Sequence, residues 1–105
     1  MKEITVQQLK EKLDNKEDIQ LIDVREPYEY EIANIGAELI PLGTVLDNTD
    51  RIAKDKPVII HCKSGVRSAT IIMNLEQRFG FTNLYNLKGG ILAYAREVDH
   101  SISTY

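Results

Sequence analysis

The single cysteine of the chain, Cys62, lies in a segment whose residue types can make its sulfur reactive. The segment reads HCKSGVRS, so Lys63 follows the thiol directly and Arg67 lies five positions on. Amides in a loop that leads into a helix lack internal partners and can point at one spot. Glycine at position 65 lets the backbone curl around that spot. The thiolate is the nucleophilic form of cysteine, so we predict a catalytic Cys62 held as an anion.

The amount of stabilisation that this anion needs shows which parts must act together. A free thiol has a pKa near ~8.5, so a thiolate that dominates at neutral pH needs about 2.7 kcal/mol. A helix N-terminus supplies about 0.3–1 kcal/mol, whereas each hydrogen bond to a charged group supplies roughly 1.5–3 kcal/mol. Several loop amides and a nearby cation are therefore required together. The predicted binding residues are Lys63, Ser64, Gly65, Val66, Arg67 and Ser68.

Competing interpretations of the cysteine and the histidines remain open at this point. A lone cysteine beside a strand is often just a small buried apolar residue. His61 is a tempting general base for Cys62, but consecutive strand residues point to opposite faces, so we expect a packed, hydrogen-bonded imidazole. His100 lies in a polar tail and is expected to be solvated. These residues have no metal-ligand spacing, and we predict neither a metal nor a cofactor.

A second polar group follows another apolar run. The sequence LIDVRE places Asp23 and Arg25 near the end of a predicted strand. We favour a structural ion pair that fixes the loop; the functional alternative is that Arg25 adds positive potential to the site. The next residues are interpreted as one exposed helix face: Glu26, Tyr28, Glu29, Tyr30 and Glu31.

The elements that must position these residues alternate along the chain. Short apolar runs at 19–24, 58–61 and 82–87 predict buried strands, and residues 37–43 a short extended piece. Helical periodicity appears at 6–13, 27–34 and 67–79, weakly at 47–54, and again at 91–98 after a flexible double-glycine turn. This order predicts an α/β fold with a mainly parallel sheet and helices on both faces. Ligands of such sheets bind beyond the carboxyl ends of the strands, where Cys62 lies.

Composition narrows the classes of function. The chain has 105 residues, 43% of them apolar and 28% charged, which is typical of one ordinary domain. The formal charge of −3 offers no general attraction to nucleic acid or to an anionic membrane. One cysteine cannot form an internal disulfide, and the charged start of the sequence is unlike a signal peptide. We therefore expect a cytoplasmic, reducing location.

Three stretches of the sequence resemble the rhodanese-like domain family. They read LIDVREPYEYE, IGAELIPL and VIIHCKSGVRSATIIMNLEQRFGFTNLYNLKGGILAYAREVD, and together they span roughly residues 4–99. The Cys-x-x-x-x-Arg-Ser loop and the Asp-Val-Arg strand end are the most specific parts. The resemblance implies a single rhodanese-like domain over residues 1–105, with a five-stranded sheet.

The resemblance also implies roles for individual residues. Cys62 is the expected carrier of sulfane sulfur as a persulfide, and residues 63–67 form the loop around it. Arg67, with Lys63, is expected to hold a small anionic sulfur donor such as thiosulfate. Asp23 and Arg25 match the strand end of the family, where the role is more structural.

The end of the chain is similar to rhodanese domains fused to molybdopterin- or thiamine-type adenylyltransferases. That similarity implies two possible protein partners, a ubiquitin-like sulfur-carrier protein and a cysteine desulfurase. A related Cys-loop-Arg arrangement occurs in phosphatases and arsenate reductases, but their loops are one residue longer than the four residues here, 63–66. A non-enzymatic module on the same fold is the third alternative, although such modules typically lack the cysteine or the arginine.

Overall fold

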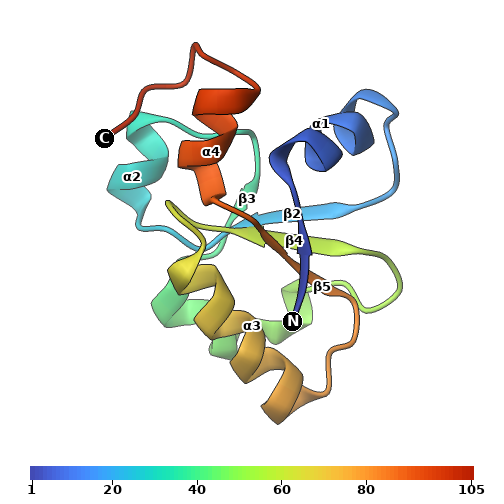
Figure 1. Ribbon diagram of the computed structural model, residues 1–105. Helices are drawn as coiled ribbons and strands as arrows, with labels where there is room; N and C mark the ends of the chain where they lie inside the picture. The colour runs from blue at the N-terminus through green and yellow to red at the C-terminus, as the bar shows by residue number, and fades with distance from the viewer.

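Five short strands form one sheet in which every pairing is parallel (Figure 1). The computed structural model describes all of residues 1–105. The order of the strands across the sheet is β1-β5-β4-β2-β3. The strands are β1 (Lys2–Ile4), β2 (Gln20–Asp23), β3 (Glu38–Leu39), β4 (Val58–His61) and β5 (Leu84–Leu87).

Helices cover both faces of this sheet, as predicted (Figure 1). The α-helices are α1 (Val6–Asp14), α2 (Pro27–Ile32), α3 (Val66–Phe79) and α4 (Gly90–Glu97), and the 3-10 helices are η1 (Leu42–Asp47) and η2 (Thr49–Arg51). Two apolar clusters lie between these layers. One packs α3, η1 and Ile52 against the sheet, and the other packs α1 and α4 against the opposite face. Alternate residues of β4 enter different clusters, which is the pattern of a strand buried on both sides.

Local signals explain where the helices begin and end. Thr5 and Gln8 form a capping box at the start of α1, since each side chain binds the backbone amide of the other residue. Gly80 ends α3 in the left-handed conformation, with φ of 73°. Both features confirm the sequence-based predictions for these helices. None of the helices is long and apolar enough to cross a membrane.

The structure also corrects several predicted elements. Residues 2–4 form an edge strand beside β5, which the polar start of the sequence did not indicate. The weak helix predicted over 47–54 is replaced by the two 3-10 helices, and α2 ends two residues before Asn34. The Asn48 side chain binds the carbonyl of Thr44, and such competition with backbone bonds disfavours a longer α-helix.

Register brings the chemically interesting residues to one edge of the sheet. Asp23, the last residue of β2, is paired directly with His61, the last residue of β4. Cys62 and Arg25 therefore follow neighbouring strands at their carboxyl ends. This is the edge at which the sequence predicted a ligand site.

Candidate active site

The sulfur of Cys62 faces hydrogen-bond donors at the start of α3. The amide of Gly65 donates to Sγ at 3.1 Å, and the amide of Ser68 donates at 3.4 Å. The hydroxyl of Ser68 lies 3.3 Å from the same sulfur. The Cys62 residue is only 1% exposed, yet polar groups rather than aliphatic side chains alone surround its reactive atom.

This arrangement changes the acidity of the thiol. Burial is the largest single influence on the pKa of Cys62, and by itself it raises the pKa. The hydroxyl and amide of Ser68, with the amides of Gly65 and Ser64, act in the opposite direction. Together they outweigh burial, so the net pKa is lowered from its ordinary value. The loop favours the thiolate, as the residue pattern indicated.

One hydroxyl proton is shared between two acceptors. Ser68 donates to Oδ1 of Asn86 at 2.6 Å, while its oxygen also lies beside Sγ of Cys62. A hydroxyl has a single proton, so Ser68 cannot donate to both groups at once. In the thiol state the S–H can donate to the Ser68 oxygen; in the thiolate state Sγ and Oδ1 of Asn86 are both acceptors for the single Ser68 proton. Asn86 therefore competes directly with the Cys62 anion.

Backbone hydrogen bonds join the loop to the start of α4. The amide of Ile91 donates to the carbonyl of Cys62 at 3.0 Å, and the amide of Leu92 donates to the carbonyl of Lys63 at 3.1 Å. A Cβ at Gly90 would lie 2.4 Å from the Lys63 oxygen, so only glycine allows this approach. The predicted flexible turn is thus wrong at Gly90, which begins α4 and packs against the loop.

Gly65 gives the loop its curvature. Its φ of 104° lies in the region that disfavours side chains, and it precedes the first residue of α3. The carbonyl of Gly65 accepts a hydrogen bond from Nδ2 of Asn86 at 3.0 Å. Asn86 therefore contacts both the loop and Ser68, so one buried amide on β5 fixes both sides of the sulfur site.

The guanidinium group of Arg67 is paired with a carboxylate. Its Nη1 and Nη2 atoms donate to the two carboxylate oxygens of Glu29 at 2.7 and 2.9 Å. The Arg67 side chain is 33% exposed, whereas that of Glu29 is 3% exposed. This pair lowers the pKa of Glu29 to about 2, chiefly through the hydrogen bond from Arg67. The interpretation of Glu29 as part of an exposed helix face was wrong.

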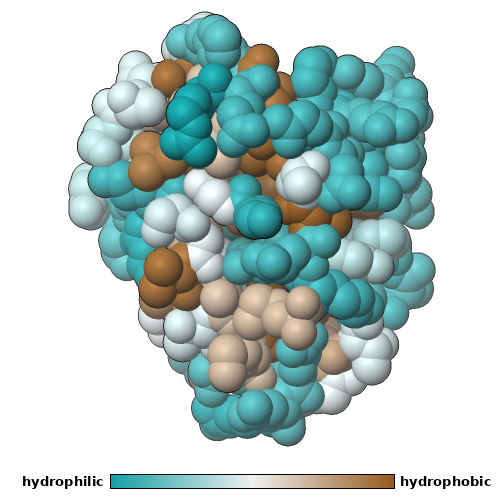
Figure 2. Space-filling view, in the orientation of Figure 1, coloured by the Kyte–Doolittle hydropathy of each residue, from teal (hydrophilic) through white to brown (hydrophobic).

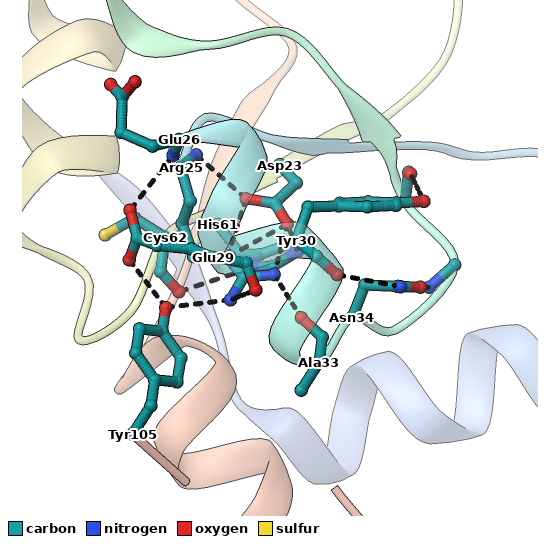
Figure 3. Close-up of polar contacts among 12 residues, drawn as sticks. Asp23, Arg25, Glu26, Glu29, Tyr30, Ala33, Asn34, His61, Cys62 and Tyr105 are labelled. Atoms are coloured by element: carbon teal, nitrogen blue, oxygen red, sulfur yellow. Dashed lines mark hydrogen bonds and ion pairs between the residues drawn. The ribbon is translucent and has the colours of Figure 1, made fainter. Parts of the chain in front are cut away.

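The last residue of the sequence joins this pair. The Tyr105 hydroxyl donates to Oε2 of Glu29 at 2.7 Å and accepts a bond from Nη1 of Arg25 at 2.8 Å (Figure 3). Nζ of Lys63 lies 4.3 Å from the centroid of the Tyr105 ring. Lys63 is therefore near the site as predicted, but its ammonium group faces an aromatic ring.

Asp23 and Arg25 form an ion pair inside the protein. Nη2 of Arg25 lies 2.7 Å from Oδ2 of Asp23, and neither side chain is exposed. Arg25 also donates to the carbonyls of Glu29 and Ala33, so it ties α2 to the end of β2 (Figure 3). These contacts match the structural role that the sequence favoured for the pair.

His61 points away from the Cys62 sulfur, as predicted from strand alternation. Its Nδ1 lies 3.2 Å from the carbonyl of Cys62, and its Nε2 lies 3.6 Å from Oδ2 of Asp23 with no hydrogen-bond partner. Burial, the largest influence, lowers the pKa of His61. His61 is therefore a neutral donor to the backbone and is not placed to deprotonate Cys62. His100 is exposed.

The outer side of the loop is open to solvent and partly apolar. Val66 is 70% exposed at the start of α3, where Figure 2 shows an apolar patch. A hollow of about 470 Å³ adjoins it, lined in part by Ser64, Gly65 and Met73. No group of three or more His, Cys, Asp and Glu side chains is arranged to hold a metal.

Three residues of the site were not found from the sequence. Asn86 carried a usable signal, because an amide inside the apolar run LYNL must find partners once buried. Glu29 was seen but placed on an exposed face. Tyr105 gave no signal, since its hydrogen bonds join residues 76 and 80 positions apart.

Comparisons with known proteins identify the family. The family model for the rhodanese-like domain matches residues 5–97. This chain belongs to the rhodanese-like domain family. Its five-stranded α/β fold agrees with the crystal structure of a rhodanese-like domain protein from Staphylococcus aureus. That structure has a TM-score of 0.83 and 34% identity, and the match covers 100% of this chain and 99% of the other.

Relatives of this rhodanese-like chain include named sulfurtransferases. A protein named "Sulfurtransferase" from Allochromatium vinosum is 37% identical over 95 residues, which cover 90% of this chain and 88% of that protein. The "Probable adenylyltransferase/sulfurtransferase MoeZ" of Mycobacterium tuberculosis is 36% identical over 106 residues, covering 97% of this chain. The chain spans only 26% of that protein and 38% of the "Rhodanese-like/PpiC domain-containing protein 12, chloroplastic" of Arabidopsis thaliana.

Proposed function

We propose that this protein is a sulfurtransferase that carries sulfane sulfur as a persulfide on Cys62. The sulfur comes from thiosulfate or a donor persulfide and passes to a thiophilic acceptor. The observation that carries the proposal is the ring of donors around Sγ, formed by the amides of Gly65 and Ser68 and the Ser68 hydroxyl. The relatives named as sulfurtransferases support the same chemistry.

Two displacements at sulfur complete the reaction. The Cys62 thiolate attacks the outer sulfur of thiosulfate, the S–S bond of the donor breaks, and sulfite leaves with the electron pair. An acceptor such as cyanide then attacks the terminal sulfur, the persulfide S–S bond breaks, and the thiolate returns. No external oxidant or reductant is required. Two half-reactions through a covalent intermediate predict ping-pong kinetics.

The loop suits each stage of this cycle. The lowered pKa of Cys62 increases the fraction of the thiol that is present as the attacking thiolate. The added sulfur would lie about 2 Å beyond Sγ. Lys63 and Arg67 supply the positive charge for an anionic donor, and Arg67 must then share its guanidinium between that donor and Glu29.

A sulfur-relay role is the second candidate. The similarity to MoeZ, which is named as both an adenylyltransferase and a sulfurtransferase, favours it. In this role the persulfide passes to a ubiquitin-like sulfur-carrier protein, and a cysteine desulfurase loads Cys62. The exposed Val66 beside the loop gives such a protein partner an apolar contact.

Thiocyanate formation from thiosulfate and cyanide tests the proposal. We expect parallel lines in double-reciprocal plots for the wild type and no activity above background for Cys62→Ser. Asn74→Ala, on α3 but away from the loop, is the matched control and should keep the wild-type rate. Unchanged turnover by Cys62→Ser would remove the proposed mechanism. Cys62-dependent hydrolysis of an aryl phosphate would instead favour the phosphatase alternative.

A further inference from the structure

The segment after α4 returns toward the active site. A turn redirects the chain: the amide and hydroxyl of Ser101 bind Oδ1 of Asp99, and the amide of Ile102 binds the Asp99 carbonyl. Ile102 packs against the apolar cluster between α1, α4 and the sheet. The chain then ends beside α2 (Figure 1). The path of residues 99–102 is therefore fixed independently of the active site.

Residues 103–105 contact the rest of the protein in a different way from residues 99–102. Ser103 and Thr104 are exposed, and no hydrogen bond joins either of them to another residue. Tyr105 is half-buried, and its hydroxyl makes the bonds to Glu29 and Arg25 described above. The hydrogen bonds of residues 103–105 are thus those of the Tyr105 hydroxyl alone.

Tyr105 contacts Lys63 directly and Arg67 through Glu29, and these are the two cations proposed to hold an anionic donor. Lys63 stacks on its ring, and Glu29, which binds its hydroxyl, also binds both terminal nitrogens of Arg67. In the view of Figure 3 the Glu29 carboxylate lies between the sulfur of Cys62 and the Tyr105 hydroxyl. Both cations next to the thiol are thereby engaged while Tyr105 is bound.

Arg25 and Glu29 do not depend on Tyr105 for their partners. Asp23 and two backbone carbonyls bind Arg25, and Glu29 binds Arg67 and the amide of Glu26. Burial is the largest of the influences that raise the pKa of Tyr105, so its hydroxyl stays a neutral donor near pH 7. Removing Tyr105 should therefore leave the fold in place and change only the approach to Cys62.

We propose that Tyr105 is a selectivity residue of the Cys62 site, which restricts anionic donors by keeping the Lys63 ammonium against its ring and by donating to the Glu29 carboxylate that binds Arg67. When residues 103–105 lift away, Lys63 becomes free and Glu29 loses one of its hydrogen-bond donors. An anionic donor then meets more positive charge at the mouth of the site. This inference deepens the proposed sulfurtransferase function, and it rests on that function for the identity of the donor.

Two alkylating reagents of nearly equal size distinguish an effect of reagent charge from an effect of physical access to Cys62. Iodoacetamide is neutral and iodoacetate is anionic, and both alkylate the Cys62 thiolate. We expect Tyr105→Ala to increase the rate constant for iodoacetate about tenfold and that for iodoacetamide only about threefold. Tyr105→Phe keeps the ring over Lys63 but loses both hydroxyl bonds, so its rate constants should lie between those of wild type and Tyr105→Ala.

Tyr28→Ala is the matched control, because Tyr28 is an α2 tyrosine that is 64% exposed and outside the site. It should leave both rate constants unchanged. Equal acceleration of both reagents by Tyr105→Ala would overturn the charge selectivity, and rates within twofold of wild type would overturn the whole inference. Alkylation needs only a thiolate, so these rates remain informative even if no sulfur transfer is found.

Discussion

Two arginine–carboxylate pairs lie at the same edge of the sheet and differ in what surrounds them. The Arg25–Asp23 pair is fully buried, and its arginine also binds two backbone carbonyls. The Arg67–Glu29 pair is equally short, but a third of the Arg67 side chain remains exposed beside the cysteine loop. Similar contacts therefore have different surroundings: the first joins elements of the fold, and the second lies beside the loop where we propose that a donor binds.

The extent of burial determines how much stability is lost when one partner of a pair is removed. Removing one partner of a fully buried pair strands the other charge in a medium that solvates it poorly. Removing a partly exposed arginine costs less stability, because water can take its place beside the carboxylate. The two arginines should therefore separate stability from activity, and the following substitutions test that separation.

Arg25→Ala should produce the largest effect, a loss of about 3–5 kcal/mol in the free energy of unfolding. The substitution leaves Asp23 buried beside a neutral His61. Urea denaturation monitored by circular dichroism measures the change. Arg67→Ala is the comparison variant and should cost less, about 2 kcal/mol, because Arg67 is one-third exposed although its partner Glu29 is buried. Equal losses for the two variants would contradict the contrast between the pairs.

Arg67→Ala should instead reduce sulfur transfer. We expect kcat/KM for thiosulfate to fall about a hundredfold, because a cation next to the anionic donor is lost. Arg67→Lys should recover only part of this activity, since lysine lacks the fork that binds two oxygens. Initial rates of thiocyanate formation measure both variants. A folded Arg67→Ala protein with wild-type kinetics would place the donor elsewhere.

Glu29 links stability to pH in a defined window. Its pKa falls from 4.5 to about 2 in the folded protein, so the carboxylate stabilises the fold fully above the higher value. That stabilisation is lost as the pH falls toward the lower value. Glu29→Gln should be about 2 kcal/mol less stable at neutral pH and should lose less stability on acidification. Denaturation at several pH values would show parallel curves if the pair contributed nothing.

Ser68→Ala should have the smallest effect. The variant loses the hydroxyl that lowers the pKa of Cys62, so that pKa should rise. At neutral pH we expect the rate of alkylation by iodoacetamide to fall roughly fivefold, and the pH–rate profile to shift toward alkaline pH. Thr70→Ala, at an exposed position of α3 two residues after Ser68, should leave the profile unchanged. An unshifted profile for Ser68→Ala would mean that Asn86 keeps the proton throughout.

Local and periodic features of the molecule could be predicted from the sequence. The capping box at Thr5, the end of α3 at Gly80 and the strand before Cys62 all follow from neighbouring residue types. The opposite orientations of His61 and Cys62 followed from strand geometry alone. The number of strands came from the family resemblance, because residues 2–4 are too short and polar to indicate a strand.

Contacts between distant segments could not be predicted. The bonds of Glu29 to Arg67 and of Tyr105 to Arg25 depend on how α2 and the final residues are placed against the loop. No spacing in the chain encodes that placement. The close approach of Gly90 to the loop was missed for the same reason, since a double glycine alone indicates only freedom of the backbone.

The central claim is that Cys62 holds a transferable sulfur atom among the donors of its loop. Intact-protein mass spectrometry after incubation with thiosulfate tests this claim most directly. We predict a gain of one sulfur atom that maps to the peptide containing Cys62, disappears on reduction or addition of cyanide, and is absent in Cys62→Ser. A wild-type mass that stays unchanged with both thiosulfate and a persulfide donor would contradict the account.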